Sequence, residues 1–298
     1  MSIFLHKQVQ NKKALVTFAI GKKYQDLFAM HAEEKFLAYC KKFDYDLICI
    51  TETLDQSERA QKRSPAWQKL LILSQSWSKN YTQILWLDTD IIINVHNAKD
   101  IADGAPLDKI SAVNQYAIPT KELYQIAFER YYLSRFGEIP TVNNLSPSSY
   151  YKNHGLTVGD DLTEVVQTGV WLASPIHHKD LLEKIYYGHE DVNHGIIREQ
   201  YEMPAMSLEL LKSQQVHWIQ CQFNFDVICH LFAYYPHLMI APAEQSTVNE
   251  AADADREEKE RLEQELIRAL NAIYQLSIFM HFNGCHQIMI DYSKHIDR

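Results

Sequence analysis

An alternation of apolar, strand-like runs with helical patterns in the N-terminal part of the chain constrains its fold most strongly. Residues 14–20 form an apolar run typical of a buried strand, residues 24–42 carry apolar positions at helical spacing, and residues 45–50 form a second strand. We expect a helix to begin at Ser64-Pro65, because serine caps a first turn and proline fits into it. This order predicts a parallel sheet flanked by helices, with ligands beyond the carboxyl ends of its strands.

The next strand, residues 84–87, runs directly into Asp88-Thr89-Asp90, and three isoleucines follow at 91–93. Two carboxylates beside an apolar strand are costly to desolvate unless a cation or strong donors compensate them. Carboxylate oxygens are the ligands of hard divalent cations, which commonly carry phosphate groups. The pattern therefore indicates a metal and phosphate site, while the alternative, a strand-end Asp88 followed by a solvated Asp90 in a turn, stays open.

The composition is that of a globular protein and excludes several classes of partner. The chain has 298 residues, 46% hydrophobic and 22% charged, with a formal net charge of −9, so we expect no nucleic-acid surface. Its five cysteines include no C-x-x-C pair, which argues against a disulfide framework or a zinc site. No apolar run reaches the length of a signal core or a membrane span, so we expect a cytoplasmic protein without a transmembrane segment.

The remainder of the chain continues the mixed pattern. We expect a helix over residues 121–136, a long functional loop over 137–163 and a strand over 165–173. Gly169 interrupts that strand and suggests a close approach of the backbone to a ligand. Residues 250–275 carry one apolar stripe among many charges and predict a surface helix.

A second chemical signal lies near the end of the chain. The apolar run of residues 277–280 ends at His281, and a glycine turn at Gly284 follows it. The sequence contains neither the glycine fingerprint of dinucleotide-binding folds nor a P-loop, so a metal would have to do more of the work of holding phosphates.

Several short motifs carry a resemblance when they are taken in order. They are Trp67-Gln68-Lys69, Asp88-Thr89-Asp90, Gln167-Thr168-Gly169-Val170, Glu202-Met203-Pro204-Ala205, Phe223-Asn224 and His281-Phe282-Asn283-Gly284-Cys285-His286. The ordered set resembles the metal-dependent nucleotide-sugar glycosyltransferases of GT-A fold, in particular a galactosyl/xylosyl/mannosyltransferase family with a late His-Phe-x-Gly-Cys-Lys segment. The resemblance implies an α/β fold, a Rossmann-like, mixed and mainly parallel sheet with flanking helices and a C-terminal helical extension. We expect residues 1–245 to bind donor and acceptor, and residues 246–298 to return to the metal site.

The resemblance also implies roles for individual residues. Asp88, Asp90 and His281 would bind Mn²⁺ or Mg²⁺, and the imidazole favours Mn²⁺. Glu202 would face the anomeric carbon as a catalytic residue, and Asn224 would support that acid or the sugar hydroxyls.

The resemblance implies more residues for the donor site than for the metal site and catalysis. Lys69 would reach the sugar or a carboxylate near the phosphates, and Gly284 would let the backbone approach the diphosphate. The strand of residues 14–20 would cradle the base and ribose, and residues 167–169 would line the sugar pocket. The donor-binding residues implied in this way are Thr17, Ala19, Gly21, Trp67, Lys69, Asp88, Thr89, Gln167, Thr168, Gly169, Gly284 and His286.

The implied reaction moves a hexose or pentose from a nucleoside-diphosphate sugar, with UDP favoured, to a carbohydrate or other hydroxyl acceptor with retention. His286 departs from the family pattern, because it stands where a lysine neutralises the leaving phosphate. Two alternatives stay open: a nucleotide-sugar-binding protein without catalysis, and an aspartyl-phosphate phosphatase with Asp88 as nucleophile and Gly159-Asp160-Asp161 as its later acidic motif. The oligomeric state is left open.

Overall fold

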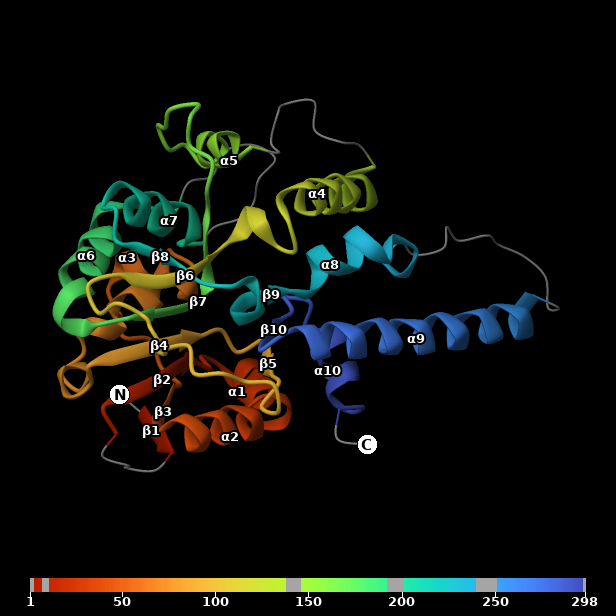
Figure 1. Ribbon diagram of the computed structural model, residues 1–298, viewed down its shortest axis with the longest axis horizontal. Coiled ribbons are helices and arrows are strands. Elements are labelled where there is room, and N and C mark those ends of the chain that lie inside the picture. Colours follow the sequence, from red (N-terminus) through yellow and green to blue (C-terminus); the bar gives the residue numbers. More distant parts are fainter. Residues whose placement is uncertain (1–2, 7–10, 138–145, 192–200, 240–250, 297–298) are drawn as a thin grey trace.

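The computed structural model describes most of the chain. The described residues are 3–6, 11–137, 146–191, 201–239 and 251–296. They form a mixed α/β fold with a seven-stranded sheet in the order β1-β3-β2-β4-β7-β6-β8 and a three-stranded sheet in the order β5-β10-β9 (Figure 1).

The strands and helices have the following bounds. The strands are β1 Ile3–His6, β2 Lys13–Phe18, β3 Tyr45–Ile50, β4 Gln83–Leu87, β5 Ile91–Ile93, β6 Ile110–Asn114, β7 Val166–Ala173, β8 Val216–Trp218, β9 Phe225–Asp226 and β10 Phe279–His281. The α-helices are α1 Lys22–His31, α2 Glu33–Phe43, α3 Glu58–Gln61, α4 Lys121–Phe136, α5 Pro147–Asn153, α6 Pro175–Gly188, α7 Met203–Lys212, α8 Val227–Tyr234, α9 Ala251–Leu276 and α10 His286–Ser293. The 3₁₀ helices are η1 Pro65–Ser74, η2 Ser78–Asn80, η3 Gln115–Ala117, η4 Cys221–Asn224 and η5 Pro236–Leu238.

The large sheet is mixed but mainly parallel, as the resemblance implied. Strands β3, β2 and β4 are parallel neighbours, and β6 and β8 run in the same direction at the far side of β7. Strand β7 is antiparallel to both β4 and β6, and β1 is antiparallel to β3. The antiparallel strands are therefore β1, at one edge, and β7, which follows the part of the chain in which strands and helices alternate.

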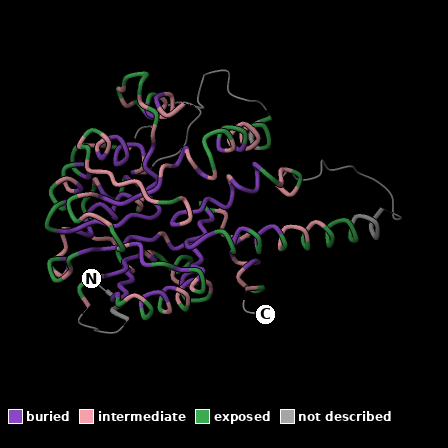
Figure 2. Tube along the Cα trace, viewed as in Figure 1, coloured by how far each residue is buried: buried purple, intermediate pink, exposed green. Residues whose placement is uncertain are grey.

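Both faces of the large sheet are buried along β2, β3, β4, β6 and β7. Along β2, Leu15 packs into a core with α1 and α2, whereas Ala14 and Val16 pack into a second core with η1 and α6. Figure 2 shows the resulting buried band through the strands, between more exposed helices. The strand residues are apolar almost without interruption because each face is covered.

The small sheet joins distant parts of the chain. Strand β10 pairs antiparallel with β5, which follows the Asp88-Thr89-Asp90 segment, and parallel with β9. His281 lies opposite Ile91 on one side and Asp226 on the other. The C-terminal part of the chain is thereby brought to the edge where β4 ends.

Several helix predictions need correction. The single helix expected over residues 24–42 is two helices that meet at Ala32, and the helix after Ser64 is a 3₁₀ helix. Ser64 caps it, as predicted, by accepting a hydrogen bond from the Ala66 N–H at 3.2 Å. The long loop expected over residues 137–163 contains helix α5, capped by the hydroxyl of Ser146, and residues 138–145 lie outside the described residues.

The surface helix expected near the C-terminus is α9. Figure 1 shows it extending away from the sheets. Leu270 and Ile273 anchor its C-terminal half in the core, while Arg256 and Arg261 form exposed ion pairs with glutamates on its own surface. Within the described part of the chain, no helix combines the length and apolar character that crossing a membrane would require.

Candidate active site

A cavity of about 800 Å³ opens at the carboxyl end of β4, where the sequence analysis placed a ligand site. Its lining includes Asp88, Thr89 and Asp90, residues 167–169 of β7, and His281 with residues 283–286. Helices α4 and α8 also contribute to the lining. A space of this size is within the range of small-molecule sites in proteins, which is about 300–1,000 Å³.

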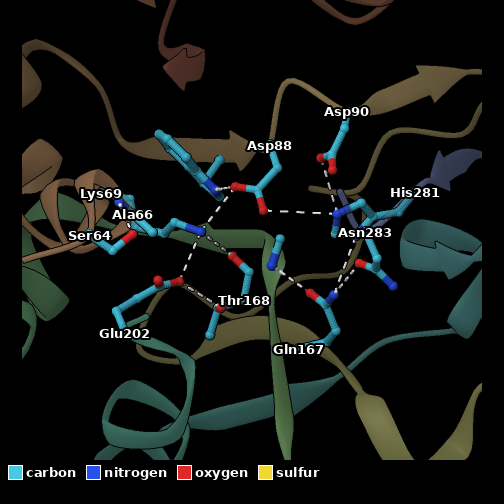
Figure 3. A network of polar contacts seen from close by, with 12 residues as sticks. Ser64, Ala66, Lys69, Asp88, Asp90, Gln167, Thr168, Glu202, His281 and Asn283 are labelled. Atoms are coloured by element: carbon cyan, nitrogen blue, oxygen red, sulfur yellow. Dashed lines mark hydrogen bonds and ion pairs between the residues drawn. The ribbon is translucent and has the colours of Figure 1, made fainter. Parts of the chain in front are cut away.

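Asp88, Asp90 and His281 converge at one side of this cavity (Figure 3). One ligand atom from each of the three residues lies within 4.8 Å of the others. The Nε2 atom of His281 is 3.3 Å from Oδ1 of Asp90 and 3.9 Å from Oδ2 of Asp88. Two carboxylates and an imidazole in this arrangement can hold a divalent cation.

The orientation of the His281 ring is fixed from behind. Its Nδ1 lies 2.8 Å from Oδ1 of Asn224, and Nδ2 of Asn224 donates to Oε1 of Gln167 at 2.7 Å. The same Gln167 oxygen accepts the N–H of Gly169. Since an amide oxygen can only accept, Nδ1 of His281 carries the proton and Nε2 faces the two carboxylates, which is the tautomer that metal-binding histidines use.

The charges of Asp90 and His281 stabilise each other. Burial alone would lower the pKa of His281, but the Asp90 carboxylate outweighs it and raises that pKa above its ordinary value. Burial would likewise raise the pKa of Asp90, yet His281 holds it well below its usual range. Asp90 and His281 therefore each favour the charged form of the other.

Gly169 allows His281 to reach this position. A Cβ atom built on Gly169 would collide with Cε1 of His281 and lie 2.8 Å from Nδ1. A ligand was expected to approach the backbone closely at Gly169, and in the structure the His281 ring makes a close approach there. Because Gly169 also lies on the cavity wall, a ligand would contact the same strand beside it.

Lys69 joins two carboxylates on the other side of Asp88. Its Nζ is 3.0 Å from Oδ1 of Asp88 and 2.9 Å from Oε1 of Glu202, and it is almost completely buried. Thr168 donates its hydroxyl to the same Glu202 oxygen at 2.8 Å. Burial would lower the pKa of Lys69, but Asp88 and Glu202 outweigh it and raise that pKa above its ordinary value. The lysine therefore reaches a carboxylate, one of the two roles expected for it.

The glycine turn after His281 contributes a backbone donor. The Gly284 N–H donates to Oδ2 of Asp90 at 2.6 Å, and Gly284 has a φ of +79°, a conformation that favours glycine. Nε2 of His286 is 4.0 Å from the same carboxylate oxygen, and its ring contacts Tyr24 edge to face. Thr89 is buried at the cavity wall between the two aspartates.

Three predicted donor residues do not lie on the cavity wall. Thr17 and Ala19 point to the face of β2 that α1 and α2 cover, and Gly21 is an exposed residue before α1. Phe18 and Ile20, one position away in each case, line the cavity instead. Side chains alternate along a strand, so an error in the choice of face assigns every second residue, here Thr17 and Ala19, to the cavity in place of its neighbours.

Two further predicted residues lie behind the cavity surface. The Trp67 indole is buried, stacks on the Arg63 guanidinium and donates its N–H to Asp191. Asn224 is fully buried among Gln167 and His281 and is not among the cavity-lining residues. Its contacts support the histidine rather than Glu202, which corrects the position expected for it.

The aromatic side of the cavity was not among the features predicted from the sequence. Helix α4 contributes Tyr124, Phe128, Tyr131 and Tyr132 to the lining. These positions are separated by four, three and one residues, a helical spacing that places them along one side of α4. This spacing could have indicated a ligand-binding face on the helix, but aromatic stripes on helices more commonly pack into a core.

No family model and no curated protein matches this sequence. Among solved structures, a glycosyltransferase involved in the glycosylation of the major capsid of PBCV-1 is 12% identical, with a TM-score of 0.48 over 95% of this chain and 98% of that one. The glycosyltransferase GlyE of Streptococcus pneumoniae TIGR4 is 16% identical, with a TM-score of 0.43 over 95% of this chain and 60% of that one. The bifunctional glycosyltransferase WbbM is 9% identical, with a TM-score of 0.42 over 98% and 51% of the two chains. This chain therefore spans only part of the length of GlyE and WbbM.

Proposed function

We propose that this protein is a metal-dependent glycosyltransferase that moves a hexose or pentose from a nucleoside-diphosphate sugar to a hydroxyl acceptor. The observation that carries the proposal is the convergence of Asp88, Asp90 and the oriented Nε2 of His281 at one wall of a large cavity. UDP as the nucleotide and retention of anomeric configuration follow the motif resemblance and are part of the proposal.

The three side chains fit a divalent cation. They offer two carboxylate oxygens and one imidazole nitrogen, and Asn224 holds the ring nitrogen toward the carboxylates. Carboxylates alone suit Mg²⁺, whereas the added imidazole favours Mn²⁺. When bound, the cation would supply positive charge beside the diphosphate leaving group.

The residues of the chain add to this stabilisation. The Gly284 N–H fixes one oxygen of Asp90, so the carboxylate is oriented before a cation arrives. His286 lies at the cavity wall where the family pattern has a lysine, and we propose that it donates an N–H to a phosphate oxygen. An imidazole donor there gives weaker neutralisation than a permanent ammonium would.

Glu202 remains the proposed carboxylate near the anomeric carbon. It lines the cavity, and Lys69 and Thr168 both contact its Oε1. These contacts hold the carboxylate in a fixed position and compensate part of its negative charge. A carboxylate held in this way would stabilise positive charge at the sugar as the leaving group departs. Lys69 also contacts Asp88, which couples the sugar side of the site to the metal side.

The donor would extend from the metal ligands toward β2. We propose that Phe18, Ile20 and Tyr24 contact the nucleoside, replacing Thr17 and Ala19 in that role. The sugar would lie beside Thr168 and Gly169, which line the cavity next to Glu202. In this proposal residues 246–298 form a segment that contributes His281 and His286 to a site otherwise built by residues 1–245.

The proposed setting is the cytoplasm. All five cysteines are free thiols in the structure, and two of them, Cys40 and Cys49, are buried in the core. Free cysteines are typical of proteins in a reducing compartment.

The proposal is tested by incubating the protein with a panel of nucleotide sugars and measuring release of the nucleoside diphosphate. We expect release that requires Mn²⁺ or Mg²⁺, stops with EDTA and is lost in Asp90→Asn. Binding of a nucleotide sugar without turnover would favour the non-catalytic alternative. Trapping of phosphate on Asp88 would favour the phosphatase.

A further inference from the structure

One part of the cavity lining is a set of aromatic rings from α4, α5 and α8. We call the aromatic wall the set Tyr124, Phe128, Tyr131 and Tyr132 of α4, Tyr150 of α5 and Phe232 of α8, all of which line the cavity. The proposed donor contacts use other residues, from segment 18–24, η1, the Asp88-Thr89-Asp90 segment, β7 and the segment that follows β10. The proposed function therefore gives the aromatic wall no role.

The sequence of α4 places its rings on the cavity side. Tyr124, Phe128 and Tyr131 follow each other at intervals of four and three residues, the spacing of neighbours on one helix face. Ala127 belongs to the same face and also lines the cavity. On other sides of the helix, Ile126 is 39% and Leu133 50% exposed.

Contacts between helices hold this face in place. Nη1 of Arg130 donates to the carbonyl oxygens of Phe232 at 3.0 Å and Ala233 at 2.7 Å, which ties α4 to the end of α8. The rings of Tyr131 and Phe232 meet edge to face, with centroids 5.7 Å apart. The rings of Phe128 and Tyr132 are 4.6 Å apart. The wall is therefore a packed surface before any ligand arrives.

The chemistry of the aromatic wall matches a neutral sugar ring. A pyranose has a face of C–H groups, which packs against an aromatic face, and a rim of hydroxyls, which needs hydrogen-bond partners. Tyrosines offer both a ring and a hydroxyl, and Asn153 and His154 add polar groups to the same part of the lining. An aliphatic chain would make no use of these polar groups.

The charge of the lining argues against an anionic ligand at the wall. Among the described residues that line the cavity, Lys69 is the single lysine or arginine, and both Asp88 and Glu202 already contact it. Phosphate and carboxylate ligands are normally held by arginine or lysine side chains. A neutral ligand is therefore favoured at the wall.

We propose that the aromatic wall is the acceptor subsite and that it binds a neutral pyranose ring stacked on the tyrosines of α4. This inference rests on the proposed function, because it takes the metal side of the same cavity as the donor site. The acceptor is then an uncharged glycan or glycoside, and its reacting hydroxyl points from the wall toward the sugar bound beside Glu202. The aromatic wall would bind the apolar face of the acceptor ring, while the metal side would bind the diphosphate of the donor.

The test is saturation-transfer difference NMR with methyl glucosides, methyl galactosides and maltose as probes. Spectra are recorded with the protein alone and then with UDP and Mg²⁺ present, since Mg²⁺ is diamagnetic and does not broaden the probe signals. We expect at least one of these neutral probes to bind, with the strongest transfer to the C–H protons of one ring face. Glucose 6-phosphate, which carries the same ring with a charge, should bind more weakly.

Variants assign the binding to the wall. Tyr132→Ala and Tyr131→Ala should each lower the affinity for the probe about tenfold, the size expected for a lost stacking partner. Tyr132→Phe and Tyr131→Phe keep the rings and should retain most of the affinity. Leu133→Ala, a matched control at an exposed position of the same helix, should leave binding unchanged, and circular dichroism checks that each variant is folded.

Two results would overturn the inference. One is that none of the neutral probes binds the wild-type protein in either condition. The other is that folded Tyr132→Ala and Tyr131→Ala variants bind the probe as well as the wild type. Because the NMR experiment follows pyranoside binding and needs no donor turnover, its failure is distinguishable from failure of the proposed function, which would appear as absent metal-dependent release of nucleoside diphosphate.

Discussion

The two sides of the cavity are built in different ways. On the polar side, Asp88, Asp90, Gln167 and His281 lie on or directly beside strands, and hydrogen bonds connect them to Asn224 or to the neighbouring backbone. On the aromatic side, α4 and α8 present side chains held mainly by ring packing and by Arg130. One side is fixed by strand register and the other by helix packing.

This difference has a consequence for ligand recognition. A cation with a diphosphate needs ligand atoms placed to a fraction of an ångström, which hydrogen-bonded strand ends can supply. A sugar face tolerates small shifts of a ring, so packed aromatic side chains are sufficient there. Mutations on the polar side should therefore cause large, specific losses, and mutations on the aromatic side smaller ones.

The largest expected effect comes from removing one charge on the polar side. Asp90→Asn keeps the shape of the side chain but takes away a ligand charge and the partner of His281. We expect metal-dependent release of nucleoside diphosphate to fall about a thousandfold, equal to about 4 kcal/mol of transition-state stabilisation. Steady-state rates at saturating Mn²⁺ measure this, with Asp160→Asn, an exposed aspartate, as the control. A loss below tenfold would show that Asp90 is not a ligand.

The next effect concerns the buried lysine. Lys69→Met leaves Glu202 buried without its cation and should lower the free energy of unfolding by about 3 kcal/mol. Adding Glu202→Gln to the same protein should recover part of that loss, because the uncompensated charge is then absent. Urea denaturation gives both values. Lys152→Met, which removes the cation of an exposed pair with Asp160, should cost less than about 1 kcal/mol, and equal losses at the two lysines would refute the distinction.

A methyl group at Gly169 should disturb the centre of the polar side. The added Cβ of Gly169→Ala would overlap the His281 ring and lie 3.0 Å from Oε1 of Gln167, so the histidine has to move. We expect a stability loss of about 1–3 kcal/mol and weaker Mn²⁺ binding. Calorimetric titration with Mn²⁺ and thermal unfolding measure the two effects. Gly188→Ala, where an added Cβ meets no atom within 4 Å, is the control. Unchanged Mn²⁺ affinity in Gly169→Ala would contradict the role given to His281.

The smallest of these effects should come from Asn224. Asn224→Ala removes the acceptor for the Nδ1 proton of His281 but leaves both aspartates in place. We expect Mn²⁺ affinity to fall about tenfold, as for other residues that orient a metal-binding histidine. The folded state should survive, so electron paramagnetic resonance of free Mn²⁺ can report the affinity. If Asn224 instead contacts the sugar, its loss would change turnover and leave Mn²⁺ binding as it was.

The polar side could be anticipated from the sequence for a physical reason. The break from an apolar strand into Asp88-Thr89-Asp90 is a local signal, because carboxylates at a strand end need compensation wherever the chain folds. The ordered motifs added His281 and Lys69, which the structure places beside those carboxylates. The pairing of β10 with β5 and β9, which brings His281 there, cannot be predicted from any local pattern in the sequence.

The remaining differences come from properties that depend on the whole fold. Both faces of β2 are buried, so its sequence does not tell which face meets the ligand, and Thr17 was expected where Phe18 lies. Trp67 lies in a 3₁₀ helix, whose turn differs from the α-helix that was expected, and its ring is in the core. The rings on α4 can be assigned to a ligand cavity only once the fold places α8 and the strand ends around them.

Asp88, Asp90 and His281 are proposed to hold one divalent cation at a diphosphate site. The most direct measurement is X-ray diffraction from a crystal grown with Mn²⁺ and UDP, recorded at the manganese absorption edge. We expect a single strong anomalous peak bonded to oxygens of both aspartates, to Nε2 of His281 and to the diphosphate. A peak bonded elsewhere, or none near these three residues, would contradict it.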